Sequence, residues 1–136
     1  QFNVDELKRV HQQSSALATM WLEWADDLRR FATVEISADG QITCFREKSP
    51  KRKHGLINAG VYLFERKILE ALPYDRAFSL ETELFPKMVN KGLFGVVGNG
   101  HFLDIGTPES YSEADQLMNL TKPTLQKKNL SNSQST

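Results

Sequence analysis

The sequence has little of what several common classes of protein require. Its 136 residues include one cysteine, Cys44, so no disulfide can form within the chain. No apolar run approaches the roughly 18 residues of a membrane-spanning helix, and no basic segment followed by an apolar one opens the chain. Basic and acidic side chains number 17 each, so no net charge attracts nucleic acid or an acidic membrane surface. These absences favour a cytoplasmic protein that binds neither nucleic acid nor membranes.

The composition that remains is that of an ordinary globular domain. Hydrophobic residues make up 40% of the chain and charged residues 25%. A chain of this length is expected to form one domain with a buried core. After Lys122 the sequence turns to serine, asparagine, glutamine, lysine and threonine with few apolar residues. We therefore expect a domain over residues 1–120 and a polar, disordered tail over residues 121–136.

Apolar spacing and turn residues predict that helices alternate with strands. Asn3 is expected to cap the first helix, residues 38–40 to close a hairpin, and Pro86 to kink or break the third helix. Strands that alternate with helices, together with one hairpin, indicate an α/β domain with a mixed sheet flanked by helices. The predicted helices span about residues 3–14, 66–72, 79–92 and 108–120, and the predicted strands about 16–24, 33–37, 41–45, 57–64, 93–97 and 101–105.

A basic segment directly precedes an apolar run. Residues 46–55, REKSPKRKHG, hold five lysines and arginines and one acid, and residues 56–64 are mostly apolar. The segment is either a solvated loop that leads into a buried strand or an anion-binding lip beside a pocket. Neighbouring side chains on an extended segment point to opposite faces, so Glu47 could accept from a sugar hydroxyl while Lys48 attracts a phosphate.

Asn58 is a polar residue within this apolar strand. A buried amide without partners costs roughly 1 to 3 kcal/mol, so either the protein or a ligand hydroxyl must supply its hydrogen bonds. The small residues Ala59 and Gly60 beside it would allow a ligand to approach the backbone closely. Asn58 and Gly60 are therefore candidate ligand-binding residues, and a structural role for Asn58 is equally open.

Asp104 ends the apolar strand predicted before the last helix. Ligands of open α/β sheets gather at such strand ends, and helix N-termini favour anions there. A carboxylate at this position could hold magnesium together with substrate phosphates. The alternative is that Asp104 caps the turn that follows it.

Four motifs follow one another along the chain: FREK at 45–48, GLINAGVYLF at 55–64, FSLETELFP at 78–86 and LDIGTPESY at 103–111. This is the order seen in sugar-phosphate nucleotidyltransferases, and the chain most resembles their mannose-1-phosphate and heptose-1-phosphate guanylyltransferase branch. The resemblance covers about residues 1–120 and is to the C-terminal half of such an enzyme, which implies half of a Rossmann-like nucleotide-diphospho-sugar transferase domain.

The resemblance implies a role for each matched residue. Glu47 matches an acid that contacts the sugar, Lys48 a lysine near the sugar phosphate, and Asn58 an asparagine that binds sugar hydroxyls. Asp104 matches the second magnesium ligand. In this family a sugar 1-phosphate attacks the α-phosphorus of a nucleoside triphosphate and releases pyrophosphate, a reaction that depends mainly on positioning and charge neutralisation.

The sequence also departs from the family pattern. It contains neither the loop of the form Gly-x-Gly-Thr-Arg nor the strand that ends in the first magnesium ligand, and Ala32 stands where the family usually has glycine. We therefore expect no turnover by this chain alone, and binding of a nucleoside triphosphate only where the missing half is supplied. An uncovered sheet edge would favour a homo-oligomer. Two functions remain open: a piece of a nucleotidyltransferase, or a non-catalytic sugar-phosphate-binding or assembly module.

Overall fold

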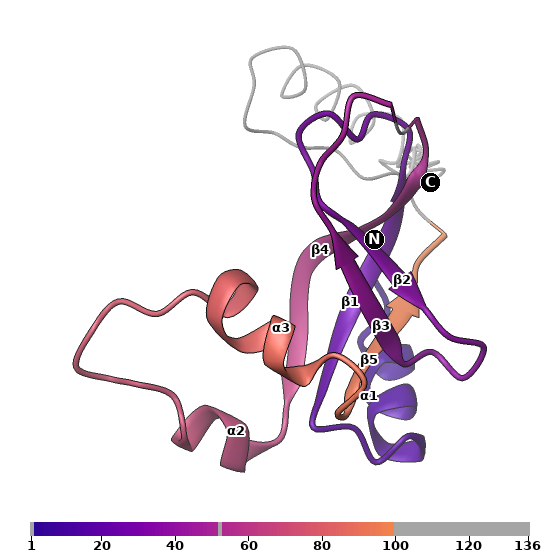
Figure 1. Cartoon of the computed structure of the whole chain (residues 1–136). Coiled ribbons are helices and arrows are strands. Elements are labelled where there is room, and N and C mark those ends of the chain that lie inside the picture. Colours follow the sequence, from indigo (N-terminus) through magenta and orange to yellow (C-terminus); the bar gives the residue numbers. More distant parts are fainter. Residues whose placement is uncertain (1, 52, 100–136) are drawn as a thin grey trace, which may run out of the picture. The chain divides into compact units, whose positions relative to one another are not determined.

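The computed structural model describes residues 2–51 and 53–99 (Figure 1). The strand and helix expected after residue 100, Asp104 and the polar tail lie outside this part of the chain. Within it, no helix is long and apolar enough to cross a membrane. The elements are α1 (Val4–Gln13), β1 (Ala18–Ala25), β2 (Thr33–Ile36), β3 (Ile42–Arg46), β4 (Gly55–Phe64), α2 (Arg66–Glu70), the π-helix η1 (Leu80–Leu84), α3 (Phe85–Met88) and β5 (Leu93–Val97).

The predicted mixed sheet is confirmed. Its three strands lie in the order β4-β1-β5, with β1 antiparallel to β4 and parallel to β5. The predicted hairpin is confirmed as the antiparallel pair β2–β3. Its turn closes through hydrogen bonds between Ser37 and Gln41 and uses Gly40 at φ 87°, a conformation that glycine adopts without strain.

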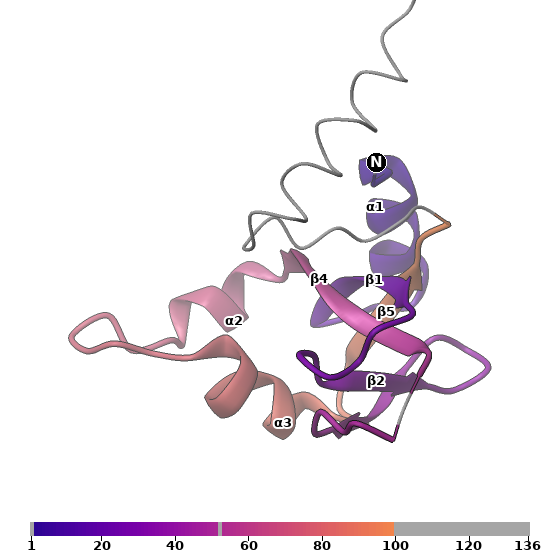
Figure 2. The same ribbon diagram turned by 90° about the horizontal axis from the view of Figure 1, so that it is seen from above.

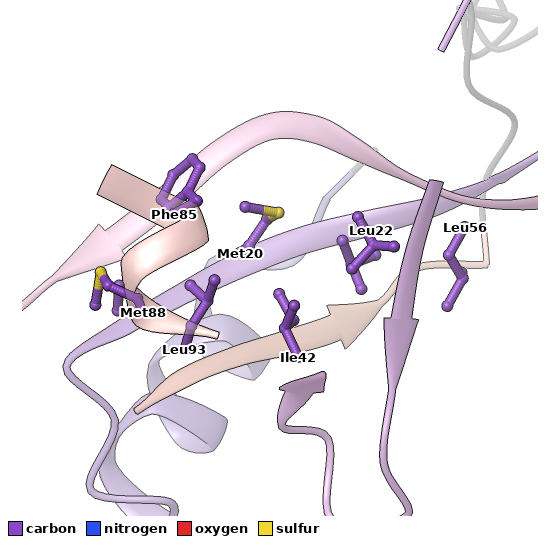
Figure 3. Packing of buried hydrophobic residues seen from close by; sticks show 9 residues of the cluster. Met20, Leu22, Ile42, Leu56, Phe85, Met88 and Leu93 are labelled. Atoms are coloured by element: carbon purple, nitrogen blue, oxygen red, sulfur yellow. The ribbon is translucent and has the colours of Figure 1, made fainter. Parts of the chain in front are cut away.

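The main core lies between the sheet and the layer formed by β2, β3 and α3. Met20 and Leu22 of β1 point to this side because alternate residues of a strand share a face, and Phe85 and Met88 of α3 lie near Met20 (Figure 3). A buried phenylalanine such as Phe85 stabilises a fold by roughly 3 to 5 kcal/mol relative to alanine. The buried members of this cluster are Ala18, Met20, Leu22, Val34, Ile42, Leu56, Phe85, Met88 and Leu93.

Helix α1 covers the opposite face of the sheet (Figure 2). Asn3 caps it as predicted, since its side-chain oxygen accepts from the backbone nitrogens of the next helical residues. The buried imidazole of His11 joins three elements: Nδ1 lies 2.8 Å from the Thr19 hydroxyl, and Nε2 lies 2.7 Å from the Glu65 carboxylate. This anchor fixes α1 on β1 and on the start of α2.

The predicted third helix is shorter than expected and divided. Residues 80–84 form a π-helix and residues 85–88 an α-helix, with Pro86 in the first turn of α3, which confirms the predicted break. The helix ends at Met88 rather than near Gly92. The backbone N–H of Asn90 bonds to the carbonyl of Ile42 at 3.1 Å, so a contact with the hairpin replaces the next helical turn. A tertiary contact of this kind leaves no sign in the local sequence.

Candidate functional site

A cavity of about 570 Å³ lies where β3 ends, β4 begins and η1 joins α3. Two of the predicted site residues, Glu47 and Asn58, line it. Glu81 and Thr82 of η1 add a second carboxylate and a hydroxyl, and the buried ring of Phe85 contributes apolar surface. The cavity thus combines polar and charged groups with an apolar ring, and convergent polar groups beside apolar surface can bind a small molecule.

Asn58 has two hydrogen-bond partners inside β4. Its Oδ1 accepts from the backbone N–H of Gly60 at 2.8 Å, and its Nδ2 donates to the Tyr62 hydroxyl at 2.8 Å. The bond from a backbone N–H fixes which end of the amide is the oxygen. One N–H and one oxygen lone pair of Asn58 have no partner among the described residues. The side chain is therefore held by the protein and still has a donor for a ligand.

Gly60 lies in a bulge of β4 rather than against the cavity. Met20 pairs with Tyr62 and Leu22 with Asn58, so four residues of β4 advance while β1 advances two. Gly60 has φ 78°, and a side chain added there would meet no atom within 4 Å. The glycine is explained by the backbone of the bulge, and it is not among the residues that line the cavity.

Glu47 and Lys48 follow the end of β3 and differ in placement. Glu47 is exposed, lines the cavity, and has no hydrogen-bond or ion-pair partner among the described residues. Lys48 is exposed and is not a lining residue. Lys51 and Lys53 are exposed as well, which is the behaviour of a solvated loop. Arg46, which lines the cavity, forms an ion pair with Glu35 across the hairpin.

The π-helix supplies a lining residue that the sequence analysis missed. Ser79 caps η1 by accepting from the Thr82 backbone N–H at 3.2 Å. The carboxylate of Glu83 accepts hydrogen bonds from the Ser79 backbone N–H at 2.9 Å and from Arg76 at 2.9 Å. These bonds hold the side chain in place and lower the pKa of Glu83. Glu81 lines the cavity instead. Acids in a first helical turn are usually read as helix-stabilising, so the local sequence did not separate the two roles.

The Tyr62 hydroxyl is electrostatically linked to this site. Burial raises the pKa of Tyr62, the hydrogen bond from Asn58 opposes that rise, and the negative charge of Glu81 adds to it. Tyr62 also packs on Phe85, with ring centroids 5.0 Å apart. The ring contact holds the hydroxyl that in turn orients Asn58.

Ala32 lines the cavity. It stands where the family that the chain resembles usually has glycine. The preceding residue, Phe31, lines it too. The methyl group of Ala32 is therefore in a place where it occupies volume that a ligand could use. This departure from the family pattern bears on which ligand fits.

A second cavity, of about 610 Å³, shares Val34 and Arg46 with the first and contains none of the predicted site residues. Trp24 and Val97 line it, and the Trp24 ring stacks on His54 with centroids 4.7 Å apart. His54 Nδ1 lies 2.8 Å from the Asp26 carboxylate. Although this cavity is slightly larger, the convergence of Glu47, Asn58 and Glu81 marks the 570 Å³ cavity as the candidate site.

The described residues contain no group of three or more histidine, cysteine or acidic side chains that could hold a metal ion. Asp104, the predicted magnesium ligand, lies outside them. The carboxylates of Glu47 and Glu81 line one cavity but do not form such a group. The magnesium role of Asp104 stays a prediction.

Comparison with known proteins identifies the family. The family model described as nucleotidyl transferase matches residues 1–120. The chain belongs to this family. The predicted resemblance to sugar-phosphate nucleotidyltransferases is thereby confirmed. The mannose-1-phosphate guanylyltransferase of Mycobacterium tuberculosis is 32% identical over 109 residues, and the D-glycero-α-D-manno-heptose 1-phosphate guanylyltransferase of Aneurinibacillus thermoaerophilus is 31% identical over 118 residues.

The match covers much of this chain and only part of each relative. It takes in 78% of this chain and 30% of the first enzyme, and 85% of this chain and 50% of the second. Among solved structures, HddC from Yersinia pseudotuberculosis matches with a TM-score of 0.67 and 29% identity over 85% of this chain and 50% of HddC. HddC has also been solved in complex with GMP-PN. The nucleotidyl transferase chain thus has the fold of half of such a protein.

Proposed function

We propose that this chain forms the sugar-phosphate-binding half of a nucleotidyltransferase that joins a sugar 1-phosphate to a nucleoside triphosphate. The observation that carries the proposal is that Glu47 and Asn58, which belong to two different family motifs, line one cavity in a chain of this family. Glu47 accepts hydrogen bonds from sugar hydroxyls, and Asn58 donates its remaining amide N–H to a hydroxyl oxygen.

The phosphate end of the substrate is assigned to Lys48. Lysine suits a phosphate because its ammonium group is a compact charge on a mobile stem. Lys48 is exposed directly after Glu47, so its side chain is free to move to a phosphate at the cavity rim. Nearby Lys51 and Lys53 add positive charge that attracts the substrate from a distance.

Nucleotide binding and the transfer step are proposed for a complete enzyme only. The chain spans between about a third and half of the relatives it matches. Residues outside this sequence would bind the triphosphate. Asp104 would contribute to magnesium binding there, and the ion would neutralise phosphate charge. We propose no turnover for this chain by itself.

A thermal-shift screen tests the substrate class. A ligand that binds the native state alone raises the apparent midpoint of unfolding. The screen compares mannose 1-phosphate and glucose 1-phosphate with inorganic phosphate and with the free sugars. We expect the sugar 1-phosphates to raise the midpoint more than either part alone. Equal shifts with inorganic phosphate, or no shift with any sugar 1-phosphate, would contradict the proposal.

Self-association is a second candidate function, favoured by a sheet edge at which β4 has no partner strand among the described residues. β4 is ten residues long and pairs only with β1 among the described strands. An unpaired strand edge offers backbone N–H and C=O groups to another chain. We propose that a second copy of this chain adds along β4. Light scattering at micromolar concentration should then give a dimer mass or more, whereas a monomer mass would count against assembly.

A further inference from the structure

Glu81 is the one carboxylate of η1 that the fold does not use. It is exposed, it lines the cavity, and no hydrogen-bond or ion-pair partner reaches it from the described residues. Glu83, two residues on, bonds to Ser79 and Arg76 and so closes the N-terminus of the same element. The helix therefore stays capped without Glu81, and a capping role does not explain this carboxylate.

The conformation of η1 determines where Glu81 is presented. A π-helix has a wider turn than an α-helix, and such turns occur frequently at functional sites. The change from π to α geometry falls at Phe85 and Pro86, which also line the cavity. The same short stretch thus supplies a carboxylate and an apolar surface to one wall of the site.

The hydrogen bonds of Asn58 show what a ligand still needs. Its oxygen is engaged by Gly60 and one of its N–H groups by Tyr62, so its strongest remaining contribution is a single N–H donor. A sugar hydroxyl that accepts this N–H has a proton of its own to donate. A carboxylate is the best acceptor for that proton, because a charge-assisted bond is stronger than a neutral one. Glu81 is close enough to Tyr62, the partner of Asn58, for its charge to affect the hydroxyl.

We propose that Glu81 is a further sugar-binding residue, which accepts a hydrogen bond from a hydroxyl of the sugar 1-phosphate beside Asn58. This inference rests on the proposed function. Glu81 belongs to η1 and Glu47 follows the end of β3, and each carboxylate requires a hydroxyl at its own position. The pair thereby restricts which sugar configurations the cavity accepts.

Isothermal titration of mannose 1-phosphate and glucose 1-phosphate into the chain tests the proposal, with inorganic phosphate as a second titrant. The variant is Glu81→Gln and the matched control is Glu70→Gln, which removes the same charge from exposed α2. We expect Glu81→Gln to weaken sugar 1-phosphate binding about tenfold or more, the usual effect of losing a hydrogen bond to a charged group. Inorganic phosphate binding should not weaken, and Glu70→Gln should behave as the wild type.

Monodeoxy analogues of the bound sugar 1-phosphate identify the hydroxyl. For the analogue that lacks the hydroxyl bound by Glu81, wild type and Glu81→Gln should have the same affinity. The proposal would be overturned if Glu81→Gln weakened the binding of every analogue in addition to the effect of the missing hydroxyl. It would also be overturned if Glu81→Gln weakened the binding of sugar 1-phosphate and of inorganic phosphate equally. If Glu81→Gln does not fold, Glu81→Ser is titrated with the same ligands, and the same two results would overturn the proposal.

The two proposals fail in different ways. A wild-type chain that binds neither sugar 1-phosphate contradicts the proposed function and this inference together. A wild-type chain that binds them, with Glu81→Gln indistinguishable from Glu70→Gln, overturns only the assignment of Glu81. In that case Glu47 and Asn58 remain the proposed sugar contacts.

Discussion

The side-chain amide of Asn58 donates a hydrogen bond to the hydroxyl of Tyr62 across 2.8 Å, within the single strand β4. Four residues of a regular strand span about 13 Å, so this contact needs a long side chain and benefits from the bulge around Gly60. The bond fixes the orientation of the Asn58 amide, so its remaining N–H is a donor with a fixed direction at the cavity. A structural bond and a ligand-binding role are thus compatible in Asn58.

The first prediction concerns the pKa of Tyr62. The charge of Glu81 raises it, so Glu81→Gln should lower the Tyr62 pKa relative to the wild type. Glu70→Gln, with the same loss of charge on α2, should leave it unchanged. NMR titration of the tyrosine ring signals measures this without any ligand. An unchanged Tyr62 pKa in Glu81→Gln would show that the two groups are not close.

The second prediction concerns the bulge. Gly60 has φ 78°, and a Cβ at this position meets no neighbouring atom, so any cost of substitution is a backbone cost. Gly60→Ala should lower the free energy of unfolding by roughly 1 to 2 kcal/mol. Gly60→Asn should cost less, since asparagine tolerates this conformation better. Urea unfolding measures both, and an alanine variant as stable as the wild type would contradict the bulge.

The third prediction concerns pH. The backbone of Ser79 and then Arg76 lower the pKa of Glu83 below its ordinary value of 4.5. A carboxyl whose pKa is lower in the folded state stabilises the fold above its ordinary pKa, and this contribution is lost as the pH falls through the folded value. Glu83→Gln should therefore be less stable than the wild type near neutral pH.

The difference between Glu83→Gln and the wild type should shrink below pH 4.5. Chemical unfolding at a series of pH values measures it. Glu81→Gln is the matched control, because no such partner reaches Glu81 from the described residues and its substitution should give no comparable loss near neutral pH. A Glu83→Gln variant whose deficit stays constant from neutral to acidic pH would indicate that the carboxylate charge is not what matters.

Local signals in the sequence predicted much of the fold. The cap at Asn3, the hairpin around Gly40 and the break at Pro86 were all readable because each depends on residues close in the chain. Two features were not. One is the early end of α3, where Asn90 bonds to Ile42 of the hairpin, and the other is the π-helical turn of residues 80–84, whose local sequence reads as an ordinary helix.

The candidate site was predicted in part. Glu47 and Asn58 were named from the sequence, and the structure brings them to one cavity. Glu81 was missed because acids at the start of a helix have an ordinary explanation, and only the contrast with Glu83 separates their roles. Gly60 was named for access to a ligand, but its conformation is explained by the bulge. The roles of all these residues in binding stay predictions.

The fourth prediction concerns turnover. Because the sequence contains no Gly-x-Gly-Thr-Arg loop, we expect no pyrophosphate release from this chain with GTP, mannose 1-phosphate and magnesium. A sensitive coupled assay measures pyrophosphate, and a full-length guanylyltransferase is the positive control. A magnesium-dependent rate that scales with the concentration of the purified chain would contradict the expectation.

The most direct test is whether Glu47 and Asn58 recognise the same ligand. Isothermal titration of mannose 1-phosphate and glucose 1-phosphate is carried out with the wild type, Glu47→Gln, Asn58→Asp and the double variant. Asn58→Asp keeps an acceptor for the Gly60 N–H but loses both amide N–H donors, so the Tyr62 hydroxyl must donate to the new carboxylate instead of accepting. Inorganic phosphate serves as the control for the added charge.

We expect the wild type to bind at least one sugar 1-phosphate saturably. Each single variant should bind it about tenfold or more weakly, and the loss of affinity in the double variant should be smaller than the product of the two single losses. This result would place both side chains on one sugar. A wild type that binds neither sugar 1-phosphate, or variants that bind as tightly as the wild type, would contradict the account.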